Sequence, residues 1–170
     1  MKKKHKIGLF IFLIIAIGLS VPQKLSMPVD GATKVDYNKD TFWYYPWGKS
    51  VTHKGIDIFA NEGTDLKSAT YGIVLFVGEI KVGGNIILIL GPKWRIHYYA
   101  HLKDMKTSSM SWVPRGKIIG SVGSSGNAKG KSPHVHYSIL TPIPYLWRFD
   151  DDRQGWKKIF YLNLIDYLVK

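Results

Sequence analysis

Short apolar segments separated by turn residues dominate the chain between residues 51 and 140. Those with the length and the β-branched and aromatic content of strands are residues 71–78, 85–90, 96–102, 117–122 and 132–139. Glycine and proline separate them at hairpin intervals, as at Gly83-Gly84 and Gly91-Pro92. No helical period occurs in this region. The pattern therefore predicts an all-β fold, mainly an antiparallel sheet or sandwich, with short helices only near the termini.

A different pattern marks the N-terminus, where residues 7–21 form an uncharged apolar run of 15 residues after a lysine-rich start. A membrane-spanning helix needs about 20 apolar residues, whereas the apolar core of a signal peptide takes about 7–15. The run ends without an Ala-x-Ala cleavage pattern, and Pro22 follows closely. We therefore expect residues 1–21 to be a signal peptide or an N-terminal membrane anchor, and the poor cleavage site favours the anchor. With either, the positive flank directs the remainder out of the cytoplasm.

The segments that flank the predicted strands have weaker patterns. Residues 22–40 mix proline, glycine and charge without a period, and are expected to link to a domain of residues 41–170. The aromatic cluster at residues 42–47 either packs at the edge of the core or lines a substrate groove. The acidic run at residues 150–152 predicts a solvated turn, because a calcium site needs more widely spaced oxygen ligands. Residues 163–169 predict a short capped helix.

Composition and charge narrow the functions to consider. The 170-residue chain contains no cysteine, which excludes disulfides, thiolate zinc ligands and a lipoprotein anchor. Its net charge is +12, of which four units come from lysines among the first six residues. A basic body favours an anionic partner such as nucleic acid, lipid head groups or a cell-wall polymer, although a merely solvated basic surface fits the same charge. Nucleic acid is not expected as a partner, because no recognised nucleic-acid motif is present.

Two motifs contain residues that suit a metal site. His134 and His136 stand two apart in a predicted strand, so both imidazoles point to one face, with Cα atoms about 6.6 Å apart. His53 and Asp57 lie on either side of Gly55. A fully extended chain would separate them by about 13 Å, too far to share a zinc ion, but Gly55 permits a bend. Each motif alone is also compatible with a surface turn or a structural histidine.

A third motif holds His97 and His101, which share one face of a regular strand, so that periodicity does not choose between them. If the motifs come together in the fold, two imidazoles and one carboxylate make a three-ligand zinc set. Such a set leaves a fourth position open for water, as catalytic sites require. The sequence contains no HExxH motif, so a glutamate base on a helix is not available in its usual form.

Three motifs occur in the same order between residues 48 and 140: His53-x-Gly55-x-Asp57, Tyr99-Ala-His101-Leu102 and His134-x-His136. Together they resemble the lysostaphin-type zinc endopeptidases, which cut peptidoglycan peptides. The resemblance implies a lysostaphin-type peptidase fold, one Zn²⁺ per chain bound by His53, Asp57 and His136, and His101 and His134 as catalytic residues. His101 is preferred to His97 because it occupies the family's YxHL position, and His97 is then structural.

The implied reaction uses zinc-bound water as the nucleophile and a histidine as general base. Whether His101 or His134 is the base stays open, and a tyrosine at position 44, 45 or 137 is a candidate to assist the oxyanion. The implied partners are peptidoglycan cross-links or stem peptides, together with the membrane if residues 1–21 are retained, at an extracytoplasmic location. Two alternatives have the same motifs: a catalytically silent regulator of a wall hydrolase, and a zinc peptidase of a Gly-rich protein.

Overall fold

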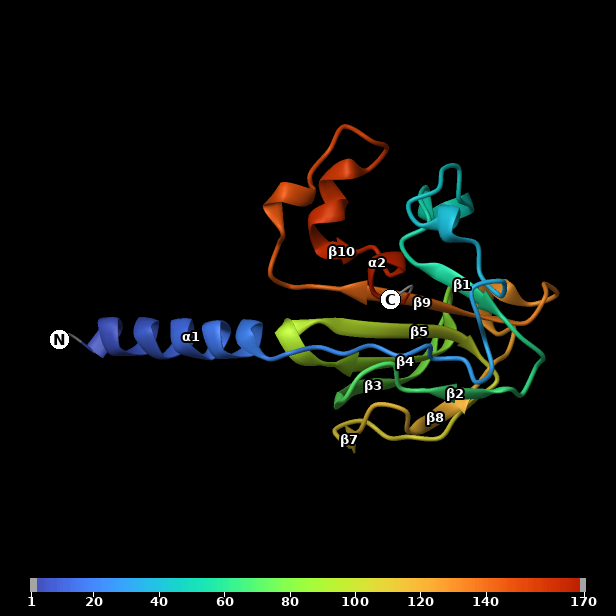
Figure 1. The fold of residues 1–170 in the computed structure, drawn as a ribbon, viewed down its shortest axis with the longest axis horizontal. Helices are drawn as coiled ribbons and strands as arrows, with labels where there is room; N and C mark the ends of the chain where they lie inside the picture. Colours follow the sequence, from blue (N-terminus) through green and yellow to red (C-terminus); the bar gives the residue numbers. More distant parts are fainter. Residues whose placement is uncertain (1–2, 169–170) are drawn as a thin grey trace.

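A computed structural model describes residues 3–168, which form two antiparallel sheets, a long N-terminal helix and several short helical turns (Figure 1). The strands are β1 (Ile56–Phe59), β2 (Asp65–Lys67), β3 (Gly72–Ile80), β4 (Gly84–Leu90), β5 (Ile96–Leu102), β6 (Asp104–Met105), β7 (Trp112–Val113), β8 (Ile118–Ser121), β9 (His134–Leu140) and β10 (Tyr161–Leu162). The α-helices are α1 (Lys3–Ser20) and α2 (Ile165–Leu168). The 3-10 helices are η1 (Lys39–Thr41), η2 (Gly48–Ser50), η3 (Pro92–Trp94), η4 (Gly126–Ala128), η5 (Leu146–Arg148) and η6 (Gly155–Phe160).

The larger sheet has the order β1-β9-β5-β4-β3-β7, with β10 paired to β9, and the smaller sheet has the order β2-β8-β6. Every strand pair is antiparallel. The all-β prediction is therefore confirmed. The strands predicted at residues 85–90 and 96–102 correspond to β4 and β5.

The two faces of the larger sheet have different roles. Ile56, Tyr99 and Tyr137 are paired across β1, β9 and β5 and are fully buried, with the two tyrosine rings stacked 4.9 Å apart. They form the core together with apolar side chains of the smaller sheet. Because side chains alternate along a strand, the intervening residues Asp57 and His136, which are directly paired, project from the opposite face. The site is built on that face.

Loops from both ends of the domain cover the site face. Figure 1 shows the segments around residues 40–50 and 142–160 rising on the same side of β1 and β9. The Trp43 indole N–H joins them by donating to the carbonyl of Arg153 (3.0 Å), and Thr52 bonds to Gln154 (3.1 Å). The aromatic segment and the C-terminal segment therefore form one wall beside the sheet.

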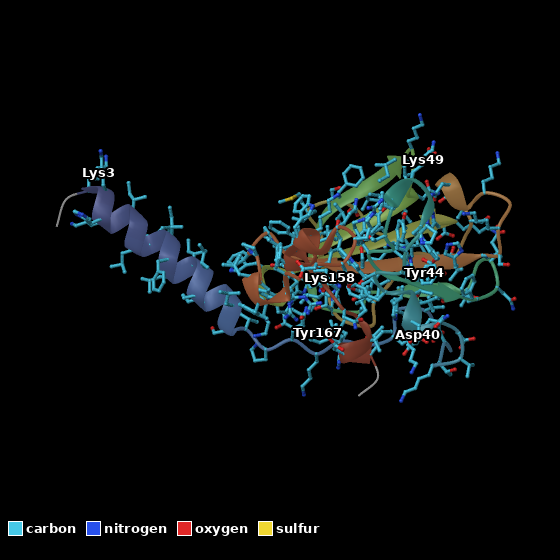
Figure 2. All side chains as sticks on the ribbon, turned by 90° about the horizontal axis from the view of Figure 1, so that it is seen from above. Lys3, Asp40, Tyr44, Lys49, Lys158 and Tyr167 are labelled. Carbon is cyan, nitrogen blue, oxygen red and sulfur yellow. The ribbon has the colours of Figure 1, made fainter. Side chains whose placement is uncertain are left out.

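Helix α1 projects from the domain with no buried side chain. Its last turn contacts η3: the Trp94 indole N–H donates to the carbonyl of Ile15 (3.2 Å). Lys93 Nζ donates to the carbonyl of Leu19 (2.9 Å). Figure 2 shows Lys3 at the end of α1 remote from the domain. Within residues 3–168, no helix combines the length and apolarity needed to span a membrane.

Residues 22–40, predicted as a linker, pack against the domain. Val29 and Tyr37 are buried, with exposed fractions of 1% and 6%. Each also pairs with the sheets through an isolated bridge, Val29 to Leu66 and Tyr37 to Ile58. Two isolated apolar residues eight positions apart are too few to define a strand or a helix period, so the sequence pattern gives no sign of this packing.

The C-terminal segment follows its sequence pattern more closely. The Asn163 side chain accepts a hydrogen bond from the backbone N–H of Ile165 (3.1 Å) and so caps α2, while position 169 of the predicted helix lies outside the described residues. In the acidic turn at residues 150–152, Asp150 and Asp152 both form ion pairs with Lys158.

Candidate active site

Three side chains converge on the site face of the larger sheet. His53 Nε2 lies 3.1 Å from Asp57 Oδ1 and 3.0 Å from His136 Nδ1, and the latter two atoms are 2.9 Å apart. Zinc bonds of about 2.0–2.1 Å in a tetrahedron separate the ligand atoms by about 3.3 Å. The triangle of donor atoms therefore has nearly the dimensions that a single zinc ion requires.

A bend at Gly55 brings His53 and Asp57 together. The chain turns at this residue before β1 begins and presses against β9. A Cβ atom at position 55 would lie 2.5 Å from the carbonyl oxygen of Tyr137 and 2.9 Å from the His136 ring. Only glycine therefore fits this approach, which closes the separation that an extended chain would impose.

The proton on His53 is placed by the main chain. His53 Nδ1 lies 3.0 Å from the carbonyl oxygen of Thr41. Because a carbonyl only accepts, Nδ1 donates, and a neutral ring then directs the Nε2 lone pair at Asp57 and His136. Three electron-rich atoms facing one another need a cation or a shared proton among them. The donor set of two nitrogens and one carboxylate oxygen suits zinc.

His101 and His134 stand beside this cluster. Their rings lie edge to face with centroids 5.0 Å apart, and both line a cleft that also contains Asp57 and His136. His101 Nδ1 contacts the carbonyl of Ser125 (3.0 Å). His134 Nδ1 contacts the carbonyl of the nearby residue 132 (2.7 Å). In its neutral form, each ring therefore keeps Nε2 free to accept a proton.

The charges of these groups follow from burial and from their partners. Burial, together with the neighbouring His134, lowers the pKa of His101 to about 4, so this ring is neutral at pH 7. Burial alone would raise the pKa of Asp57, but hydrogen bonds with His136 and His53 outweigh that effect and hold the pKa well below its usual range. Residue 57 is therefore a carboxylate at neutral pH.

The prediction that His97 and His101 share one face is wrong. Ile87 pairs with Tyr99, but Asn85 pairs with Leu102, so β5 carries one extra residue at this point. His101 adopts a left-handed conformation there, with φ of 65°. The bulge reverses the alternation and places His101 at the cleft. His97 stays on the core face, fully buried.

The tyrosines suggested as oxyanion partners do not lie at the cleft. Tyr137 is fully buried on the core face, 2.7 Å from His97 Nδ1 through its hydroxyl, so this suggestion is wrong. Tyr44 and Tyr45 are exposed and are absent from the residues that line the cleft. Tyr98, which sequence reasoning missed, lies edge-on to the His136 ring, and burial raises its pKa to about 12. Tyr98 stands two residues before Ala100, which pairs with His136, so strand alternation places it on the site face, but this register is known only from the structure.

The aromatic cluster at residues 42–47 contributes both to the edge of the core and to the lining of the cleft. Trp43 is buried, with 8% of its surface exposed, and packs against Tyr161. Trp47 stacks on the His53 ring, with centroids 4.1 Å apart and planes at 25°, and lines the cleft. One tryptophan therefore anchors the loop, and the other covers a residue of the donor cluster.

Comparison with known families identifies the class of protein that has this sheet, this cleft and this histidine-aspartate cluster. Residues 51–144 match the model of peptidase family M23, and the chain belongs to this family. The prediction of a lysostaphin-type peptidase, made from three short motifs, is confirmed.

Individual relatives and solved structures resemble about 70–75% of the chain. It is 38% identical over 142 residues to the L-Ala–D-Glu endopeptidase of Bacillus subtilis (strain 168), a match that covers 75% of this chain and 43% of that protein. The chain thus spans less than half the length of this relative. The catalytic domain of lysostaphin from Staphylococcus simulans superimposes with a TM-score of 0.60 at 26% identity, covering 74% of this chain and 86% of that one. A zinc-containing peptidase from Vibrio cholerae gives a TM-score of 0.57 at 26% identity, covering 69% and 36%.

Proposed function

We propose that the protein is a zinc-dependent endopeptidase that hydrolyses peptide bonds in cell-wall peptidoglycan. The observation that carries the proposal is the mutual approach of His53 Nε2, Asp57 Oδ1 and His136 Nδ1 to within 2.9–3.1 Å. Membership of the M23 family and the likeness to relatives named for peptidoglycan bonds support the substrate. These three residues would hold one zinc ion per chain, which would polarise the scissile carbonyl and lower the pKa of an attacking water towards about 7.

His101 and His134 supply the proton transfers in this proposal. When neutral, each ring donates its Nδ1–H to a main-chain carbonyl, so Nε2 is the atom that accepts the proton of the attacking water. The resulting imidazolium returns the proton to the leaving amine as the peptide bond breaks. One ring acts as base and acid, and the other orients water or donates to the oxyanion. Trp47 covers His53 and limits the access of bulk water to the donor cluster.

The location and attachment of the protein follow from its N-terminus. Residues 1–21 combine a basic start with an apolar run, and we propose that they direct the domain of residues 41–170 to the extracytoplasmic side as a signal peptide or anchor. Peptidoglycan lies on that side. The basic body then faces an anionic wall rather than nucleic acid.

Digestion of purified wall fragments tests the reaction. The full chain should release new peptide termini, detected by mass spectrometry, and should lose this activity with a chelator and regain it with zinc. His136→Ala should abolish both zinc binding, measured as bound metal per chain, and cleavage. A chain that stays inactive with zinc bound would contradict the enzymatic proposal and favour a regulator of the same fold.

Replacing His101 tests its separate role. His101→Ala should still bind one zinc ion, because the ligand triangle is intact, but turnover should fall by about 10²–10⁴-fold through loss of proton transfer. Bound metal and kcat are measured on the same preparation. Near-normal kcat in this variant would assign the proton transfer to His134 instead.

A further inference from the structure

Beside the donor cluster, the cleft extends into a pocket with a strongly positive lining. Lys49, Lys54 and Lys157 line it together with His53 and His136, and no aspartate or glutamate is among its lining residues. Three lysine side chains thus border one pocket. His53 and His136 of the donor cluster also line this pocket. A peptide whose scissile bond lies at the donor cluster therefore has the residues next to that bond close to the lysines.

Lys54 is held in position at the pocket wall. It follows directly after His53, is half-buried, and donates from Nζ to the carbonyls of Ser50 (2.8 Å) and Thr52 (3.2 Å). Lys157, also half-buried, comes from η6 on the C-terminal segment, and its positive charge acts on Lys54. Two elements far apart in the sequence therefore bring like charges to one place.

A neighbouring lysine provides the comparison. Lys158, next in the chain, is neutralised by ion pairs with both Asp150 and Asp152. Among residues 3–168, none of the ion pairs involves Lys54 or Lys157. Within that range, their ammonium groups lie only over aromatic rings, Lys54 over Trp43 (5.7 Å) and Lys157 over Trp156 (5.2 Å), apart from the two carbonyls that Lys54 contacts. Partly buried charges without a counter-ion are unfavourable, and the approach of an anion relieves that cost. The chain thus supplies acids for one lysine and leaves the two at the pocket without any.

We propose that Lys54 and Lys157 bind a free carboxylate of the peptide next to the scissile bond, so that the enzyme prefers acidic stem peptides to uncharged glycine bridges. This specificity rests on the proposed peptidase function. A glutamate residue joined through its nitrogen and one carboxyl group keeps its other carboxylate free, whereas an oligoglycine chain has no side-chain carboxylate. The substrate class is therefore a wall peptide with an anionic residue at the cleavage site.

Two matched stem peptides test the preference, one with the free carboxylate on its glutamate and one with that group converted to an amide. Wild-type protein should cut the acid with about tenfold higher kcat/KM than the amide, the size expected for a charge-assisted hydrogen bond in a partly buried site. Lys157→Gln should reduce this ratio to about threefold or less. Lys117→Gln, an exposed lysine remote from the pocket, should keep the wild-type ratio.

Binding of the same two labelled peptides, measured by fluorescence anisotropy, separates this inference from the proposed function. Equal kcat/KM for acid and amide, or faster cleavage of pentaglycine than of the acid, overturns the carboxylate pocket and leaves the peptidase intact. Tighter binding of the acid that depends on Lys157, without cleavage of either peptide, supports the pocket and overturns the peptidase. An unchanged acid-to-amide ratio in Lys157→Gln overturns the assignment to that lysine.

Discussion

Main-chain carbonyls fix the direction in which three of the cleft imidazoles present their lone pairs. His53, His101 and His134 each place Nδ1 within 3.0 Å of a carbonyl oxygen. Each ring therefore presents Nε2 to the cleft when neutral. The partner of His134 is two residues away, but those of the other two lie 12 and 24 residues away, outside the strands. The sequence identifies the histidines, but it does not identify loop partners at such separations.

A fourth histidine, His97, makes stability depend on pH. Burial and the nearby charge of Arg95 lower the pKa of His97 to about 3 in the folded chain. The unfolded value is about 6.5. Between these values the unfolded chain binds a proton that the folded chain does not. The contribution of His97 is therefore complete above about pH 6.5 and is lost as pH falls towards 3, by about 1.4 kcal/mol per pH unit.

His97→Gln tests this dependence. Free energies of unfolding of the variant and the wild type, measured in denaturant between pH 7.5 and 4.5 with a chelator present, should differ in slope by about one proton. The wild type should lose stability faster as pH falls. The chelator keeps metal binding out of the comparison. Parallel curves for the two proteins would mean that His97 is not kept neutral by folding.

At the scale of elements, the bulge in β5 lets the end of this strand contribute His101 to the cleft. Strict alternation places His101 with His97 on the core face, and the extra residue moves it to the other face. Sequence reasoning missed this because bulges with positive φ usually carry glycine, and position 101 carries histidine. Family resemblance, not periodicity, selected the histidine that lines the cleft.

The bulge predicts that glycine at position 101 gives a more stable protein than alanine, the reverse of the order in a regular strand. In a regular strand, glycine is less stable than alanine by about 0.5–1 kcal/mol. With φ of 65° at residue 101, alanine meets the left-handed penalty that glycine avoids. His101→Gly should therefore be more stable than His101→Ala by about 1 kcal/mol, measured by thermal or chemical unfolding. The usual ranking at this position would argue against the left-handed conformation.

At the scale of the whole molecule, Arg95 joins both ends of the chain to the sheet. Its guanidinium is buried and hydrogen-bonds the side chain of Gln23 from the N-terminal segment. It also contacts the hydroxyls of Tyr145 (3.4 Å) and Tyr167 (3.2 Å) and stacks over the Tyr167 ring. One side chain thus connects three segments that are distant in sequence. The composition of residues 22–40 conceals this role, because a single glutamine supplies the contact.

Arg95→Met should weaken the packing of the N-terminal segment around Gln23 and of the C-terminal segment around Tyr167 against the sheet. Loss of these hydrogen bonds should lower the free energy of unfolding by about 2 kcal/mol and increase hydrogen exchange in residues 161–168. Arg115→Met, at an exposed turn, is the matched control and should leave both measurements unchanged. Equal protection of residues 161–168 in the two variants would show that Arg95 does not hold the C-terminal segment.

The short connection behind α1 has a consequence for where the protein can work. Only Val21 and Pro22 lie between Ser20, the last residue of α1, and Gln23, whose side chain is bonded to Arg95. The chain between Ser20 and Gln23 therefore spans at most about 10 Å. With residues 1–21 retained in a bilayer, the catalytic domain would have almost no radius of action and could trim only the innermost layer of the wall. Under the proposed function, removal of residues 1–21 would free the domain to diffuse outward, and retention or removal of this segment would then set the depth of wall that it reaches.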